Sequence, residues 1–243
     1  MVLKDPSPAE VKKFLKKEIT SLWKEAGLEE IPERARARLK RSQPMPPPPP
    51  PAEGNPSLQT LEEIRAWIGD CKRCGLCEAR HSIVFGTGDP KAELMFVGEG
   101  PGADEDAQGL PFVGRAGKLL DKIIEAMGRE RAQVYIGNIV KCRPPSNRVP
   151  EPSEAQTCLP FLKEQIRLVH PKLIVALGST ATLYLLGQAK PMTQTRGQIF
   201  PLSWDASIPV LPTYHPAYLL RNPPAKKLVW EDMQKAMRHL GSH

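Results

Sequence analysis

Short apolar runs alternate with helix-like stretches from Ser57 onward, and this alternation limits the possible folds more than any other feature of the chain. Apolar runs predict buried strands at residues 94–97, 134–136, 173–177 and 210–211. Helical spacing of apolar residues predicts helices at residues 61–68, 117–127, 153–169 and 180–186. Strands that alternate with helices form a mostly parallel sheet covered on both faces. We therefore expect a three-layer α/β/α domain around a four-stranded, mostly parallel sheet.

The segment after the first predicted strand is rich in glycine. Open sheets of this type bind ligands beyond the carboxyl ends of their strands, so chemistry is expected there. Gly98, Gly100 and Gly102 allow close approach of the backbone to a ligand, and Glu99 and Glu105 are candidates for acid, base or orienting roles. The spacing is not that of a dinucleotide-binding motif.

Polar residues also follow the second and fourth predicted strands. Asn138 offers one amide donor and one acceptor to the edge of a planar ring, although an Asn that merely closes a turn fits the sequence as well. His215 precedes a proline, which holds it extended just before a helical turn and fixes its ring direction. A single His is often structural, but its place at a strand end favours a functional role. Arg221 lies one or two helical turns later and suits a phosphate contact.

Four of the five cysteines form two pairs, Cys71-x2-Cys74 and Cys142-x15-Cys158. Four thiolates suit either zinc or an iron–sulfur cluster, so their spacing leaves the metal open. Cys77 is surplus, and we interpret it as a small buried residue or a free thiol. We expect an intracellular protein, because no stretch reaches the 18 apolar residues of a membrane span and the first residues lack the order of a secretory signal.

Residues 1–43 differ from the rest, with eleven Lys and Arg against seven Asp and Glu, more than half of the net charge of +7. Apolar residues at helical spacing predict a basic amphipathic helix there, which could dock on the main domain, bind a partner protein or lie along DNA phosphates. Residues 44–56 hold six consecutive prolines and read as an extended spacer, or as a ligand for a proline-recognising module. The predicted catalytic domain then spans residues 57–243.

Several of these blocks, in this order, resemble the motifs of family 4 uracil-DNA glycosylases, the iron–sulfur branch of the superfamily. The blocks lie at residues 98–102, 109–117, 138–148 and 215–221, together with the four cysteines. The resemblance covers about residues 65–240. It implies a uracil-DNA glycosylase-like fold and a [4Fe-4S] cluster held by Cys71, Cys74, Cys142 and Cys158.

The resemblance also implies roles for the residues at the strand ends. Phe112 would stack on a flipped uracil, Asn138 would read its O4 and N3–H edge, and backbone groups around Glu99 and Gly100 would close the pocket. His215 is the candidate donor to uracil O2 in the transition state. Glu105 would orient His215, and Asn147 would help to place the water or the backbone of the flipped nucleotide.

The expected activity is that of a monofunctional glycosylase that hydrolyses the N-glycosidic bond of uracil in DNA and so initiates base excision repair. We expect a monomer in the cytoplasm, associated with the nucleoid, with a possible protein partner at residues 1–51 and no membrane contact. One alternative is an inactive glycosylase-fold module that binds DNA beside a polymerase or another repair protein. A structural zinc-ribbon protein is the second alternative.

Overall fold

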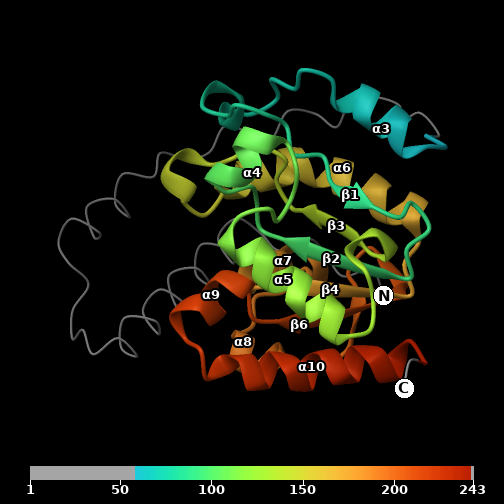
Figure 1. The fold of residues 1–243 in the computed structure, drawn as a ribbon. Coiled ribbons are helices and arrows are strands. Elements are labelled where there is room, and N and C mark those ends of the chain that lie inside the picture. The colour runs from blue at the N-terminus through green and yellow to red at the C-terminus, as the bar shows by residue number, and fades with distance from the viewer. Residues whose placement is uncertain (1–57, 242–243) are drawn as a thin grey trace.

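The computed structural model describes residues 58–241, and a six-stranded sheet forms its centre (Figure 1). The strand order is β1-β3-β2-β4-β6-β5. Four neighbouring strands run parallel and confirm the four predicted ones: β3 (Tyr135–Asn138), β2 (Leu94–Gly98), β4 (Leu173–Leu177) and β6 (Asp205–Thr213). The expected extension at residues 1–43 and linker at residues 44–56 lie outside the described residues.

Two short antiparallel strands at the sheet edges make the sheet larger than the four strands expected from the sequence. β1 (Thr87–Gly88) pairs with β3, and β5 (Phe200–Leu202) pairs with β6. β1 has only two residues, and Gly88 adopts a φ of +131° in a place where a Cβ would lie 1.8 Å from the carbonyl oxygen of Val134. Neither strand is long enough to give an alternating apolar pattern, so sequence periodicity could not reveal them.

Helices cover both faces of the sheet and confirm the three-layer architecture. Alternate strand residues point to opposite faces, so Met95 and Val97 join one apolar core and Leu94 and Phe96 join the other. The first core is closed by α3 (Leu61–Ile68), α6 (Pro152–Val169) and α7 (Ser179–Leu186). The second is closed by α5 (Arg115–Ala126), α9 (Pro216–Arg221) and α10 (Ala225–His239).

Local sequence signals explain where these helices begin. Thr60 and Glu63 form a capping box at the start of α3, and Pro152 occupies the first position of α6, where its missing N–H costs nothing. Short helices fill the connections: α4 (Ala103–Gln108), α8 (Met192–Thr195), and the 3-10 turns η1 (Gly75–Glu78), η2 (Arg131–Gln133) and η3 (Pro145–Asn147). Within residues 58–241, none of the helices has the length and apolar character needed to cross a membrane.

Candidate active site and cysteine-lined cavity

A cleft of about 560 Å³ lies beyond the carboxyl ends of the parallel strands. The segments that follow β2, β3, β4 and β6 all contribute to its walls, because parallel strands end at the same edge of the sheet. The structure brings together here the candidate catalytic and substrate-binding residues that the sequence singled out: Glu99, Gly100, Glu105, Phe112, Asn138, Asn147, His215 and Arg221.

Asn138 forms part of the cleft wall and carries a free hydrogen-bond acceptor. The residue is 1% exposed, and its Oδ1 is the one buried side-chain polar atom among the described residues without a hydrogen-bond partner. Buried polar atoms are nearly always paired, so one that no protein group pairs with, beside a cleft, is a candidate contact for a ligand. A Cβ on Gly98 would lie 2.5 Å from this Oδ1 and 2.6 Å from Cζ of Phe112. Glycine at position 98 therefore lets the amide and the aromatic ring share one small space.

Glu105, on α4, fixes the loop that carries Phe112. Its Oε1 accepts hydrogen bonds from the backbone N–H groups of Val113 and Gly114, both at 2.9 Å, and its Oε2 accepts one from Gly102 at 3.1 Å. Phe112 itself has a φ of +52°, unusual for an aromatic residue. The hydrogen bonds of this carboxylate thus go to the backbone of the glycine-rich loop, and only its charge acts on His215, so the expected orientation of the imidazole by Glu105 stays a prediction.

His215 is oriented by the helix that follows it. Its Nδ1 accepts a hydrogen bond from the backbone N–H of Ala217 at 3.1 Å, as the N-cap of α9. Burial, and next the positive charge of Arg221, lower the pKa of His215 to about 4, although the Glu105 carboxylate opposes the shift. At neutral pH the ring is therefore uncharged, and because Nδ1 is an acceptor its proton is on Nε2. The ring centroid lies 5.5 Å from that of Phe112.

Thr180 is a cleft residue that the sequence reasoning missed. Its Oγ1 donates a hydrogen bond of 2.5 Å to Oε2 of Glu99, and burial raises the pKa of that carboxyl group. Thr180 lies just after β4, so the strand-end rule that selected Asn138 and His215 could also have found it. Asn147, which also lines the cleft, has a φ of +53° and accepts a hydrogen bond of 2.8 Å from Nε of Arg143 at its Oδ1.

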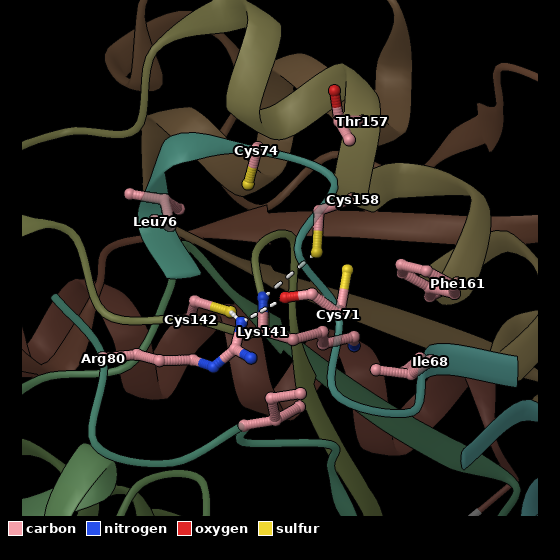
Figure 2. A pocket seen from close by; sticks show the side chains of 11 residues that line it. Ile68, Cys71, Cys74, Leu76, Arg80, Lys141, Cys142, Thr157, Cys158 and Phe161 are labelled. Carbon is pink, nitrogen blue, oxygen red and sulfur yellow. Dashed lines mark hydrogen bonds between the residues drawn. The ribbon is translucent and has the colours of Figure 1, made fainter. Parts of the chain in front are cut away.

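The four paired cysteines line a second, much smaller cavity of about 10 Å³. Figure 2 shows Cys71 and Cys74 on the segment after α3, with the side chains of Cys142 and Cys158 lining the same cavity. Cys158 Sγ accepts a hydrogen bond from the backbone N–H of Lys141 at 3.2 Å, and Cys142 Sγ accepts one from Nη1 of Arg80 at 3.4 Å. The structure thus gathers all four predicted ligands.

The chemistry of this cavity fits an iron–sulfur cluster, although the side chains are not preassembled around a metal. No group of three or more His, Cys, Asp or Glu side chains within residues 58–241 is placed to hold a metal ion. Burial raises the pKa values of Cys74 and Cys142, and raises that of Cys158 to about 12, so these groups are thiols until a cation supplies charge. Four Cys thiolates are the usual ligands of such a cluster, and hydrogen bonds to the sulfurs and exclusion of solvent set its properties. Cys77 does not line the cavity.

Comparison with known proteins identifies the family. Residues 85–234 match the model of the uracil DNA glycosylase superfamily. The chain therefore belongs to the uracil-DNA glycosylase superfamily, and its similarity to curated proteins points to the type-4 branch. It is 46% identical over 184 residues to the type-4 uracil-DNA glycosylase of Sulfurisphaera tokodaii, covering 73% of this chain and 84% of the relative.

Two further relatives carry the same description. The type-4 uracil-DNA glycosylase of Thermotoga maritima is 43% identical over 181 residues, which are 73% of this chain and 93% of the relative. The type-4 uracil-DNA glycosylase of Saccharolobus solfataricus is 42% identical over 193 residues, which are 76% of this chain and 88% of the relative. The resemblance inferred from the sequence motifs is confirmed.

Proposed function

We propose that this protein is a uracil-DNA glycosylase that flips uracil out of DNA into the cleft and hydrolyses its N-glycosidic bond. The observation that carries the proposal is the unpaired, buried Oδ1 of Asn138 beside the ring of Phe112. Uracil presents an N3–H donor and an O4 acceptor on one edge, which match the two halves of an amide. The flat face of the base would stack on Phe112, because flipped bases are held between aromatic or apolar side chains.

His215 is proposed to stabilise the leaving uracil. Cleavage breaks the bond between C1′ and N1, and the electron pair moves onto the base, where O2 gains negative charge. A neutral imidazole with its proton on Nε2 can donate a hydrogen bond to that oxygen. Loss of one such donor typically slows a reaction by about a hundred- to a thousandfold.

The attacking water would approach C1′ from the part of the cleft formed by Glu99 and Asn147. Thr180 fixes one oxygen of Glu99, which leaves the other to accept a hydrogen bond, and Asn147 can orient the same water. A bond forms between the water oxygen and C1′, and the water's proton passes to Glu99 or to solvent. Arg221 supplies a cation at the rim for the DNA phosphates.

The four cysteines are proposed to hold a [4Fe-4S] cluster. Bound there, the cluster would cross-link the segment around Cys71 to the loop after β3 and to α6, a structural contribution that needs no redox step. A brown protein that absorbs near 400 nm supports this assignment, whereas a colourless protein containing zinc contradicts it. Action as a monomer, association with the nucleoid and a partner at residues 1–51 stay predictions.

The test of this function is incubation of the full-length protein with a single-stranded oligonucleotide that carries one uracil, followed by detection of the free base. We expect free uracil and an abasic strand. Replacement of His215 by Ala should slow release by about a hundred- to a thousandfold. Tight binding of the oligonucleotide with no released uracil would instead favour the inactive DNA-binding module.

A further inference from the structure

A buried lysine lies between the candidate base-reading residue and the cysteine-lined cavity. Lys141 is 1% exposed, and its Nζ donates to the backbone carbonyl of Asn138 at 3.0 Å and to Oε1 of Gln165 at 2.6 Å. Burying an ammonium group is costly, and an apolar side chain of similar size would avoid that cost. What the ammonium group adds is a pair of directed hydrogen bonds to these two acceptors.

One of these hydrogen bonds holds the peptide group next to Asn138, and the orientation of this peptide group sets the direction of the Asn138 side chain. This peptide joins Asn138 to Ile139, and its N–H donates to the carbonyl of Gly98 at 2.9 Å while its C=O accepts from Lys141. The peptide plane is therefore held at both ends. Because the side-chain Oδ1 of Asn138 has no protein partner, its direction depends on the backbone and on packing against Gly98 and Phe112.

Gln165 anchors the lysine to the rest of the core. Its Nε2 donates to the carbonyl of Phe85 at 2.9 Å and to the hydroxyl of Tyr135 at 3.1 Å, which leaves Oε1 directed at Lys141. Gln165 is fully buried on α6. The ammonium group is thus bonded to a fixed side chain on α6, and through Lys141 this helix restrains the backbone at the end of β3.

The same lysine also meets the cysteine cavity through its backbone. Its N–H donates to Sγ of Cys158, which lies on α6 seven residues, or about two helical turns, before Gln165 (Figure 2). Helix α6 therefore holds Lys141 twice, once at the backbone by a cysteine sulfur and once at the side chain by an amide oxygen.

We propose that Lys141 is a positioning residue for uracil recognition, which holds Asn138 in its base-reading direction and ties it to the helix that carries Cys158. The inference rests on the proposed glycosylase function. It predicts that the side chain of Lys141 acts through Asn138, whereas its contact with Cys158 is made by the backbone and survives any side-chain replacement except proline.

The test is a double-mutant cycle between Lys141→Met and Asn138→Ala, measured as kcat/KM for uracil release. Lys141→Met alone should lower kcat/KM by roughly ten- to a hundredfold, the usual cost of a misplaced recognition group. In the Asn138→Ala background the same change should alter kcat/KM by no more than about twofold. Iron content and absorbance near 400 nm should match those of the unchanged protein.

Thr195→Val is the control for general destabilisation, because it removes a buried hydroxyl that bonds to Pro191 elsewhere in the fold. Any fold-change in kcat/KM caused by Thr195→Val should be the same in the Asn138→Ala background, because the two sites are independent. If Lys141→Met gives no folded protein, Gln165→Met replaces it in the cycle. This change removes one of the two acceptors of the Lys141 ammonium, along with the bonds of Gln165 to Phe85 and Tyr135, and we expect kcat/KM to fall by roughly three- to tenfold through the lost Lys141 contact.

The inference is overturned if Lys141→Met leaves kcat/KM unchanged, or if Lys141→Met has its full effect on kcat/KM in the Asn138→Ala background as well. It is also overturned if the Lys141→Met protein contains less iron than the unchanged protein. Each of these results leaves the glycosylase function standing as long as the unchanged protein releases uracil. Failure of the unchanged protein to release uracil would overturn the proposed function itself.

Discussion

At the scale of single residues, the cleft combines groups whose partners are fixed with groups left open to a ligand. Glu105 uses both carboxylate oxygens on backbone N–H groups, and His215 uses Nδ1 on Ala217. Oδ1 of Asn138 remains unpaired. A binding site needs both kinds, because the paired groups hold rigid the few atoms that meet the ligand.

Gly98→Ala tests the space shared by Asn138 and Phe112. An added Cβ would lie 2.5 Å from Oδ1 of Asn138 and 2.6 Å from Cζ of Phe112, so one of the two must move. We expect kcat/KM for uracil release to fall by about tenfold or more. Gly75→Ala is the matched control, since no atom lies within 4 Å of the Cβ it would add. Equal activity of the two variants would show that this contact does not shape the site.

The lowered pKa of His215 predicts a pH-dependent stability. Its pKa is about 4 in the folded protein against 6.5 for the ordinary imidazole, so between these values the unfolded chain binds more protons. The His215 contribution to stability is therefore complete above pH 6.5 and is lost as the pH falls toward 4. Melting temperatures measured from pH 7.5 to 4 should decline more steeply for the unchanged protein than for His215→Gln. Parallel curves would contradict the assignment of a neutral, buried imidazole.

At the scale of elements, α4 connects the cleft to the segment that follows the first cysteine pair. Its Glu105 holds the glycine-rich loop, and the neighbouring Asp106 accepts hydrogen bonds from the backbone N–H groups of His81 and Ser82 at 2.8 and 3.0 Å. A six-residue helix too short to be stable alone is thus fixed by its acidic side chains on both sides.

Glu105→Ala distinguishes a structural role for this residue from a chemical one. The change leaves three partly buried N–H groups without an acceptor. One unpaired buried group typically costs about 1–3 kcal/mol of folding stability, so we expect a loss of at least that size. We expect a lower melting temperature together with weaker uracil release. Unchanged stability with abolished release would instead place Glu105 in the chemistry, as the sequence alone suggested.

Much of the element pattern could be predicted from the sequence, because parallel strands buried on both faces are continuous apolar runs. The four central strands and helix α3 lie where periodicity places them. β1 and β5 could not be found, since two or three residues carry no period. The hydrogen-bond partners of Glu105 could not be predicted either. They are three backbone N–H groups, which come together around the carboxylate only after the loop has folded.

At the scale of the whole molecule, the candidate active site and the cysteine cavity lie on either side of the loop that follows β3. Asn138, the last residue of β3, lines the cleft, and Cys142 four residues later in the loop lines the cavity. If the four cysteines hold the proposed cluster, it would brace Asn138, the proposed base-reading residue, from outside the cleft. All candidate catalytic and ligand residues lie between Cys71 and Arg221, within the described part of the chain.

The most direct test of the account is single-turnover release of uracil from a single-stranded oligonucleotide by the unchanged protein and by Asn138→Ala. The account predicts rapid release by the unchanged protein. It predicts release slower by about a hundredfold or more by the variant, because a site that pairs with a polar edge depends strongly on that pairing. Both proteins should keep the same iron content and nearly the same melting temperature. Equal rates for the two proteins, or no release by either, would contradict the assignment of this cleft as the site of uracil excision.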